Sequence, residues 1–238
     1  FTMRILFIRH GDPDYQHDSL TPRGRQQAAA VAERLKDENI SAIYASPLGR
    51  AQETARFTAE LLNLPIQTLD YMPELIWSGD DLPFKGHPWI LSTKMINEEN
   101  FDFFQNDWQE HPYFKDNDAT RCFNTIASSF DELMKDHGFE HDGRRFFCSK
   151  ENKDTVAVFS HGGSGAAAMA HMLNLPLPYM LTFFPYDFTS VCVLNFPDRV
   201  GEYVTPRLEL FNDIKHLNGE LSSPLFQKSL DQHAGKFN

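Results

Sequence analysis

The chain has 238 residues and carries 22 basic against 33 acidic side chains, which gives a formal net charge of −11 at pH 7. Its hydrophobic fraction of 41% and charged fraction of 23% are those of an ordinary globular protein, so a disordered or fibrous chain is excluded. The negative net charge argues against a DNA-binding or RNA-binding protein. A small basic pocket inside an acidic surface is compatible with this net charge.

The cysteine pattern predicts a protein of a reducing compartment, and the lengths of the apolar runs predict no membrane span. Cys122, Cys148 and Cys192 form no C-x-x-C pair, so the sequence predicts neither a disulfide framework nor a zinc knuckle. No apolar run approaches the ~18 residues of a membrane span. The first residues lead directly into a strand-like segment without signal-peptide features. We therefore expect a cytoplasmic protein without a membrane partner.

The first part of the chain alternates short apolar runs with helical segments. Residues 3–8 (MRILFI) have the length and composition of a buried parallel strand. Thr21 and Pro22 then provide a helix cap and a proline for the first helical position. Residues 42–45 predict a second strand, and the Ser46-Pro47 pair repeats the cap-plus-proline signal for a second helix.

The last part of the chain resumes this pattern. Residues 155–159 (TVAVF) predict another buried strand, followed by an alanine-rich helix that ends near Leu173. Residues 189–196 and 202–210 are expected to be closing strands. Strands that alternate with helices indicate a three-layer α/β sandwich, with a mostly parallel central sheet and helices on both faces.

Residues 76–118 interrupt the alternation with an aromatic-rich stretch. We expect it to form a largely helical insertion over a single domain, either as a lid or as a subdomain held by its own aromatic cluster. The core then spans about residues 3–75 and 119–210, and residues 211–238 form a C-terminal tail. Trp77, Trp89 and Phe104 are candidates for lining a substrate pocket, which would favour an apolar or aromatic leaving group.

Two predicted strands end in a histidine followed by glycine. Arg9-His10-Gly11 follows the first strand, and Ser160-His161-Gly162 follows the strand at 155–159. Ligands of an open parallel sheet bind outside the carboxyl ends of its strands, so we expect the two histidines to lie close together. Arg50 falls in the first turn of the second predicted helix, where a cation lies beside the positive end of the helix dipole and favours an anion. Such a cationic cluster suits a phosphoryl group.

In these motifs the chain resembles the histidine phosphatase superfamily, which contains cofactor-dependent phosphoglycerate mutases and fructose-2,6-bisphosphatases. The resemblance rests on five segments in order, which are RHG at 9–11, LTPRGRQQA at 20–28, SPLGRAQETA at 46–55, MPEL at 72–75 and SHGG at 160–163. It covers about residues 3–75 and 154–197, and it leaves the aromatic insertion and the tail uncovered.

The resemblance implies a role for each matching residue. His10 would be the nucleophile that forms a phosphohistidine, and Glu74 would protonate the leaving group and then activate water. Arg9, Arg50 and His161 would hold the phosphoryl oxygens and stabilise charge that develops on them. Gly162 would let the backbone approach the phosphate, and Gln16 stands where mutases generally have a phosphate-binding asparagine. Neither a metal nor another cofactor is then required for the reaction.

Departures from the mutase pattern favour a phosphatase. Pro13 stands where many relatives have serine or threonine, and LIWSGDD follows Glu74 in place of the ERxYG segment of mutases. The expected activity is hydrolysis of small phosphomonoesters. A mutase-type phosphoryl transferase and a non-catalytic phospho-ligand-binding module are the alternatives. The oligomeric state is left open, a homodimer included.

Rival residues exist for several of these roles. Glu53, Asp80 and Asp81 are the other candidates for the acid. The segment 137–141 (HGFEH) matches the H-x-x-E-H zinc pattern, but its glycine predicts a helix end and not the continuous helix that the pattern needs. Ser164 resembles the nucleophile of a serine hydrolase, yet Asp187 and His216 form no recognisable pattern with it.

Overall fold

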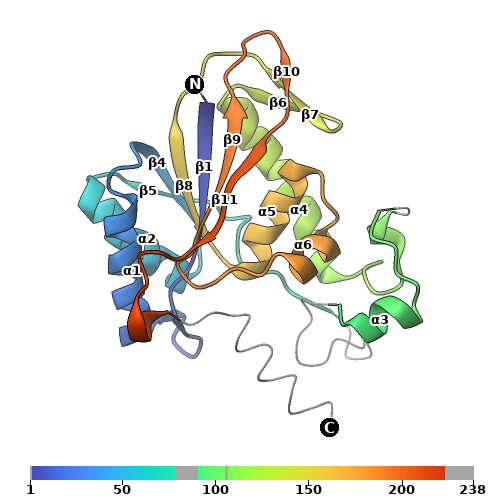
Figure 1. The fold of residues 1–238 in the computed structure, drawn as a ribbon, viewed down its shortest axis with the longest axis horizontal. Coiled ribbons are helices and arrows are strands. Elements are labelled where there is room, and N and C mark those ends of the chain that lie inside the picture. Colours follow the sequence, from blue (N-terminus) through green and yellow to red (C-terminus); the bar gives the residue numbers. More distant parts are fainter. Residues whose placement is uncertain (1, 79–90, 105–106, 223–238) are drawn as a thin grey trace.

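The computed structural model describes residues 2–78, 91–104 and 107–222, and within them a six-stranded mixed sheet forms the centre of the protein (Figure 1). Its strand order is β11-β9-β1-β8-β4-β5. The strands are β1 (Thr2–Arg9), β4 (Ile40–Ala45), β5 (Ile66–Thr68), β8 (Thr155–Ser160), β9 (Val191–Pro197) and β11 (Arg207–Asp213). The neighbours β1, β8, β4 and β5 are parallel, whereas β9 is antiparallel to both β1 and β11. The predicted mostly parallel sheet is confirmed.

Alternate residues of β1 belong to opposite layers. Leu6 and Ile8 pack in a hydrophobic cluster with the helices α1 (Pro22–Leu35) and α2 (Gly49–Leu62). Ile5 and Phe7 belong to a second cluster, together with side chains of α4 (Asp118–Asp136) and α5 (Gly162–Leu173). Because successive side chains of a strand point to opposite faces, the sheet has helices on both sides, as Figure 1 shows. The predicted three-layer sandwich is confirmed.

The two cap-plus-proline signals lead to different outcomes. Thr21 caps α1 as predicted, since its side chain accepts a hydrogen bond from the amide of Gly24. Ser46 is not the cap of α2, because that helix begins at Gly49 after Leu48 and has no side-chain cap. The Ser46 hydroxyl lies instead in the site described below.

The described part of the insertion is less helical than predicted. Its helices are α3 (Thr93–Glu98) and a single 3-10 turn at Trp108–Glu110. Buried aromatic rings hold the rest of it together, for example Phe114, whose ring centroid lies 5.5 Å from that of Trp108 and 6.1 Å from that of Phe101. Edge-to-face ring packing of this kind needs no regular backbone, which explains how an aromatic cluster forms here with little helix.

The predicted strand over 202–210 is two strands in different sheets. Its first part is β10 (Tyr203–Val204), which pairs with β7 (Arg145–Cys148) and through it with β6 (Phe139–Asp142). Its second part is β11 in the main sheet, and Pro206, which lacks an amide proton, separates the two. The remaining elements are the short hairpin of β2 (Pro13–Asp14) and β3 (Ser19–Leu20), the helix α6 (Leu177–Phe183) and a 3-10 turn at Gly219–Leu221. Within the described residues, no helix combines the length and hydropathy that crossing a membrane requires.

Candidate active site

The two strand-end histidines meet at the carboxyl edge of the sheet. Arg9 lies beside Ser160 in the parallel register of β1 and β8, so the next residue of each strand, His10 and His161, emerges at the same edge. Their ring centroids are 5.2 Å apart, and both side chains are buried, with 1% and 0% exposure. The predicted proximity of the two histidines is confirmed.

The hydrogen bonds of His10 fix its tautomer. Its Nδ1 lies 2.7 Å from the carbonyl oxygen of Gly11. Since a carbonyl oxygen only accepts, Nδ1 carries the proton and Nε2 keeps its lone pair in the neutral ring. Burial, together with the positive charge of Arg9, holds the pKa of His10 well below its usual range. His10 is therefore a neutral imidazole with an unprotonated Nε2 at neutral pH.

Ser46 orients His161. The Ser46 hydroxyl oxygen lies 2.7 Å from Nε2 of His161 and accepts a hydrogen bond from the amide of Leu48 at 3.3 Å. The hydroxyl can donate its proton to Nε2, and in that arrangement the ring proton of His161 lies on Nδ1. Nδ1 is buried and has no hydrogen-bond partner among the described residues. Burial, and next the charge of Arg50, lowers the pKa of His161 to about 3, so this ring is also neutral.

Arg9 is held by the loop that precedes β9. Its Nη1 donates to the carbonyl oxygen of Tyr186 at 2.8 Å, and its guanidinium carbon lies 4.3 Å from the ring centroid of Phe188. The Tyr186 hydroxyl donates to the carbonyl oxygen of His161 at 2.7 Å, so one residue fixes both Arg9 and the beginning of α5. The Nε of Arg9 is buried without a hydrogen-bond partner in the described part of the chain.

Arg50 lies in the first turn of α2 as predicted, and Asp18 supplies an anion for it. Nη1 of Arg50 donates to Oδ1 of Asp18 at 2.5 Å, and the Gly49 amide donates to Oδ2 of the same carboxylate at 2.6 Å. Only glycine permits this approach, because a Cβ at position 49 would lie 2.1 Å from the carbonyl oxygen of Asp18. The Arg50 side chain is buried, and its Nε has no hydrogen-bond partner among the described residues.

Glu74 reaches the same place from the segment after β5. Its carboxylate accepts hydrogen bonds from the amides of Gly163 and Ser164, both at 3.0 Å to Oε1, at the N-terminus of α5. The amide of Leu75 donates to Oε1 as well, at 2.9 Å. The first residue of this helix, Gly162, packs against the Arg9 guanidinium, since a Cβ there would lie 3.4 Å from Cζ. Glu74 and Gly162 therefore lie within one helical turn of His161.

The predicted phosphate ligand Gln16 and the candidate pocket residues of the insertion are described next. Gln16 is exposed in the turn after β2, and no contact between its side chain and the two histidines or two arginines is recorded in the described structure. Trp77 is partly buried, with its ring centroid 5.8 Å from that of Phe114, which places it in the aromatic core of the insertion. Phe104 is 61% exposed and contacts Tyr179 of α6 at 4.8 Å between centroids. Trp89, Asp80 and Asp81 lie outside the described residues.

The alternative candidates for the acid, the nucleophile and a zinc motif have surroundings that do not suit those roles. Glu53 accepts hydrogen bonds from the amide of Leu20 and the guanidinium of Arg25. Ser164 is fully buried, and its hydroxyl has no hydrogen-bond partner among the described residues, so no base is placed to activate it. The helix α4 ends at Asp136, before the HGFEH segment, as the glycine predicted.

Comparison with known proteins agrees with this geometry. The family model described as histidine phosphatase superfamily (branch 1) matches residues 5–209. The chain belongs to this superfamily. It is 25% identical over 190 residues to the adenosylcobalamin/alpha-ribazole phosphatase of Escherichia coli (strain K12), a match that covers 76% of this chain and 84% of that protein. It is 24% identical over 213 residues to phosphoserine phosphatase 1 of Hydrogenobacter thermophilus, covering 83% and 88%.

A solved structure supports the same assignment. Phosphoserine phosphatase from Entamoeba histolytica, in complex with 3-phosphoglyceric acid, superposes with a TM-score of 0.59 at 25% identity and covers 91% of this chain and 100% of that one. As a histidine phosphatase with phosphatase relatives, the protein is a hydrolase of phosphate esters.

Three residues of the site were missed by the sequence analysis. Ser46 was interpreted only as a helix cap, although its place at the end of β4, beside β8, brings it next to His161. Asp18 lies in the same loop as Gln16. The sequence signal for its position is the glycine at position 49, which allows the backbone of Asp18 to lie close to the first turn of α2. Tyr186 has no local signal, because its partners come from distant parts of the chain.

Proposed function

We propose that this protein hydrolyses small phosphomonoesters through a phosphohistidine formed at Nε2 of His10. The observation that carries the proposal is a set of three buried donors without partners in the described structure, namely Nε of Arg9, Nε of Arg50 and Nδ1 of His161. They come from three different strand or helix ends around one neutral histidine. An unsatisfied buried donor costs about 1–3 kcal/mol, so a ligand with several acceptor oxygens is favoured here.

A phosphoryl group meets this requirement. Its oxygens accept hydrogen bonds, and its negative charge pairs with the guanidinium groups of Arg9 and Arg50. The neutral His161 donates from Nδ1 without adding a further charge. These groups stabilise the charge that develops on the phosphoryl oxygens during transfer, which is the role that a metal ion has in other phosphoryl-transfer enzymes. We therefore propose a reaction that requires no metal.

The reaction takes two steps. In the first, the lone pair of His10 Nε2 forms a bond to phosphorus while the bond from phosphorus to the ester oxygen breaks, and Glu74, which enters this step as the carboxylic acid, gives its proton to the leaving oxygen. In the second, Glu74 takes a proton from water, whose oxygen attacks phosphorus as the phosphorus–nitrogen bond breaks. Inorganic phosphate leaves, and both His10 and Glu74 return to their starting states.

The substrate is proposed to be a small phosphorylated metabolite. The relatives carry the names of a phosphoserine phosphatase and of an adenosylcobalamin/alpha-ribazole phosphatase, and phosphoserine is a small phosphomonoester. A net charge of −11 disfavours a long polyanion as substrate. Phe104 stays our candidate for contact with an apolar leaving group, because it is exposed and its partner Tyr179 lies in α6, which precedes the loop that holds Arg9. The free thiols of all three cysteines suit the reducing cytoplasm, where we place the reaction.

A substrate panel tests the activity. Purified protein is assayed in the presence of a chelator against phosphoserine, 3-phosphoglycerate, nucleoside monophosphates and aryl phosphates, and 3-phosphoglycerate is tested with and without bisphosphoglycerate. We expect phosphate release from at least one small ester without added metal. Isomerisation of 3-phosphoglycerate without release of phosphate would show a mutase instead.

A further inference from the structure

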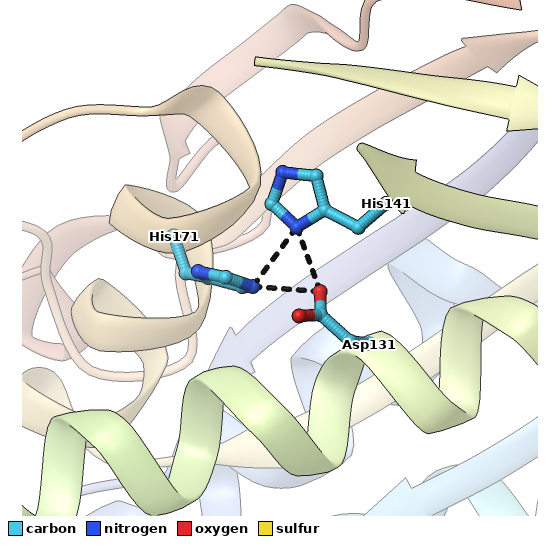
Figure 2. A group of neighbouring side chains, drawn as sticks. All are labelled: Asp131, His141 and His171. Carbon is cyan, nitrogen blue, oxygen red and sulfur yellow. Dashed lines mark hydrogen bonds and ion pairs between the residues drawn. The ribbon is translucent and has the colours of Figure 1, made fainter. Parts of the chain in front are cut away.

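A second cluster of chemically active side chains lies away from the phosphatase site. Asp131 of α4, His141 of β6 and His171 of α5 point toward one another (Figure 2). Oδ1 of Asp131 lies 2.7 Å from Nδ1 of His141 and 2.7 Å from Nε2 of His171. The two ring nitrogens are themselves 3.2 Å apart. Three potential metal ligands from three separate elements therefore form one small triangle.

The size of this triangle fits a tetrahedral metal ion. Zinc binds histidine nitrogen and carboxylate oxygen at about 2.0–2.1 Å, so two ligand atoms of a tetrahedral site lie about 3.3 Å apart. The nitrogen–nitrogen distance of 3.2 Å already has this value. The two nitrogen–oxygen distances of 2.7 Å are those of hydrogen bonds, and each needs to lengthen by about 0.6 Å to admit the ion.

Packing holds the rings in the orientation that a metal site needs. The ring of His141 stacks on the buried ring of Phe146, with centroids 4.2 Å apart and an interplanar angle of 8°. The Nε2 of His141 is buried and has no hydrogen-bond partner among the described residues, so every recorded polar contact of this ring is made by Nδ1 within the cluster. No competing contact turns the nitrogen away from the other two ligands.

The cluster also has a path to solvent. The side chains of His141 and His171 are 9% and 17% exposed, whereas that of Asp131 is 36% exposed. The carboxylate of Asp131 is therefore the part of the cluster that solvent reaches most easily.

We propose that Asp131, His141 and His171 bind a transition-metal ion such as Zn²⁺, with water in the fourth position. Two imidazole nitrogens and one carboxylate oxygen are a ligand set that suits zinc. The sequence predicts no metal ligand, because the H-x-x-E-H pattern needs a continuous helix and the glycine of the HGFEH segment predicts a helix end. His141 of that segment is a ligand here, while His137 lies elsewhere, with Nε2 at 3.1 Å from the Tyr44 hydroxyl.

The metal has a structural role in this proposal. It joins α4 and the small sheet that contains β6, which follow one another in the chain, to α5, which lies about 30 residues further on. His171 is nine residues beyond Gly162 in α5, about 14 Å along the helix axis, so the ion is remote from the phosphoryl group. Metal binding displaces protons from the two ring nitrogens, and affinity therefore falls in acid.

Metal titration of the full chain tests the proposal. The His10→Ala variant serves as background, since it removes a competing active-site histidine. Calorimetry with Zn²⁺ and absorption spectra with Co²⁺ are expected to show one equivalent bound, with the ligand-field bands of a tetrahedral site. Loss of an outer partner of a metal ligand costs 10–100-fold in affinity, so His141→Gln and His171→Gln, which remove ligands, are expected to cost at least about 100-fold. Zn²⁺ is expected to raise the Tm of the background protein and not that of the variants.

Matched variants keep the test decisive. His137→Gln changes the other histidine of the HGFEH segment and is expected to bind metal as before. Asp131→Asn is isosteric and changes the most exposed ligand, so it folds even if a histidine variant does not, and we expect it to weaken binding at least tenfold. Stoichiometric binding lost in Asp131→Asn and kept in His137→Gln supports the site. Absence of stoichiometric binding, or equal affinity in Asp131→Asn and its parent, overturns it and leaves the cluster as an ion pair only.

Discussion

Substitution of Glu74 by glutamine separates its proton-transfer role from its structural one. In Glu74→Gln the side-chain oxygen still accepts hydrogen bonds from the amides of Gly163 and Ser164, which are 3.0 Å from Oε1 in the native protein. The variant loses the interaction of a carboxylate with the positive end of α5, which is worth about 0.3–1 kcal/mol. We therefore expect the fold to survive with a small decrease in Tm.

The effect on rate is expected to be much larger and to depend on the leaving group. Positioned proton transfer contributes about 10²–10⁴-fold, equivalent to about 3–5 kcal/mol of activation free energy. An alkyl phosphate needs the proton and is expected to lose this factor in kcat. A nitrophenyl phosphate has a leaving group that departs as the anion, so its first step is expected to lose only a few-fold.

Burst kinetics with the two esters measure this difference. Glu53→Gln is the matched control, because Glu53 lies in the neighbouring helix and contacts Leu20 and Arg25 instead of α5. We expect that variant to keep kcat within a few-fold for both esters. An equal loss in the rate constant of the first step for alkyl and aryl phosphates in Glu74→Gln would refute the assignment of the acid, and so would full activity on the alkyl ester.

Three further predictions concern the residues around the phosphoryl site. Asp18→Asn removes the charge that orients Arg50 and is expected to raise KM several-fold with a smaller change in kcat; an unchanged KM contradicts this role. The pKa values of His10 and His161 are lowered in the folded protein, the latter to about 3. Both rings therefore stay neutral in the folded state over a pH range in which the unfolded chain takes up protons. Stability, followed by thermal melts, is thus expected to fall as the pH drops from about 6.5 toward 3, while kcat/KM for an aryl phosphate shows no acid limb centred near 6.5. Tyr186→Phe removes the hydrogen bond to the His161 carbonyl oxygen, which keeps the one from the Gly165 amide, and is expected to destabilise the protein by about 0.5–1.5 kcal/mol in urea unfolding; a stability equal to that of the native protein argues against this contact.

The parts of the site that could be predicted lie at the ends of regular elements. His10 and His161 follow apolar runs, and neighbouring parallel strands bring their carboxyl ends to one edge by geometry alone. Arg50 was predicted because a cation in the first turn of a helix is unusual. Each of these signals is local in sequence, and the packing of the sheet and its helices brings the three residues together.

The parts that could not be predicted depend on contacts between distant segments. The hydroxyl of Tyr186 meets the carbonyl oxygen of His161 across a separation of 25 residues, and no periodic pattern marks such a pair. Asp18 contacts Arg50 only because the β2–β3 hairpin lies against α2, and a two-residue strand is too short to show alternation. The insertion was expected to be largely helical, yet edge-to-face ring packing stabilises an irregular backbone as well.

The central claim is a phosphoryl group bound covalently to His10. Peptide mass spectrometry of the Glu74→Gln variant measures it directly. The variant is mixed with nitrophenyl phosphate and quenched in alkali, because phosphohistidine survives in alkali. We predict one phosphoryl group on the peptide that contains His10, at Nε2, and none after the further substitution His10→Ala, which is also expected to abolish turnover. A phosphoryl group on another residue, or full turnover by His10→Ala, would contradict the account.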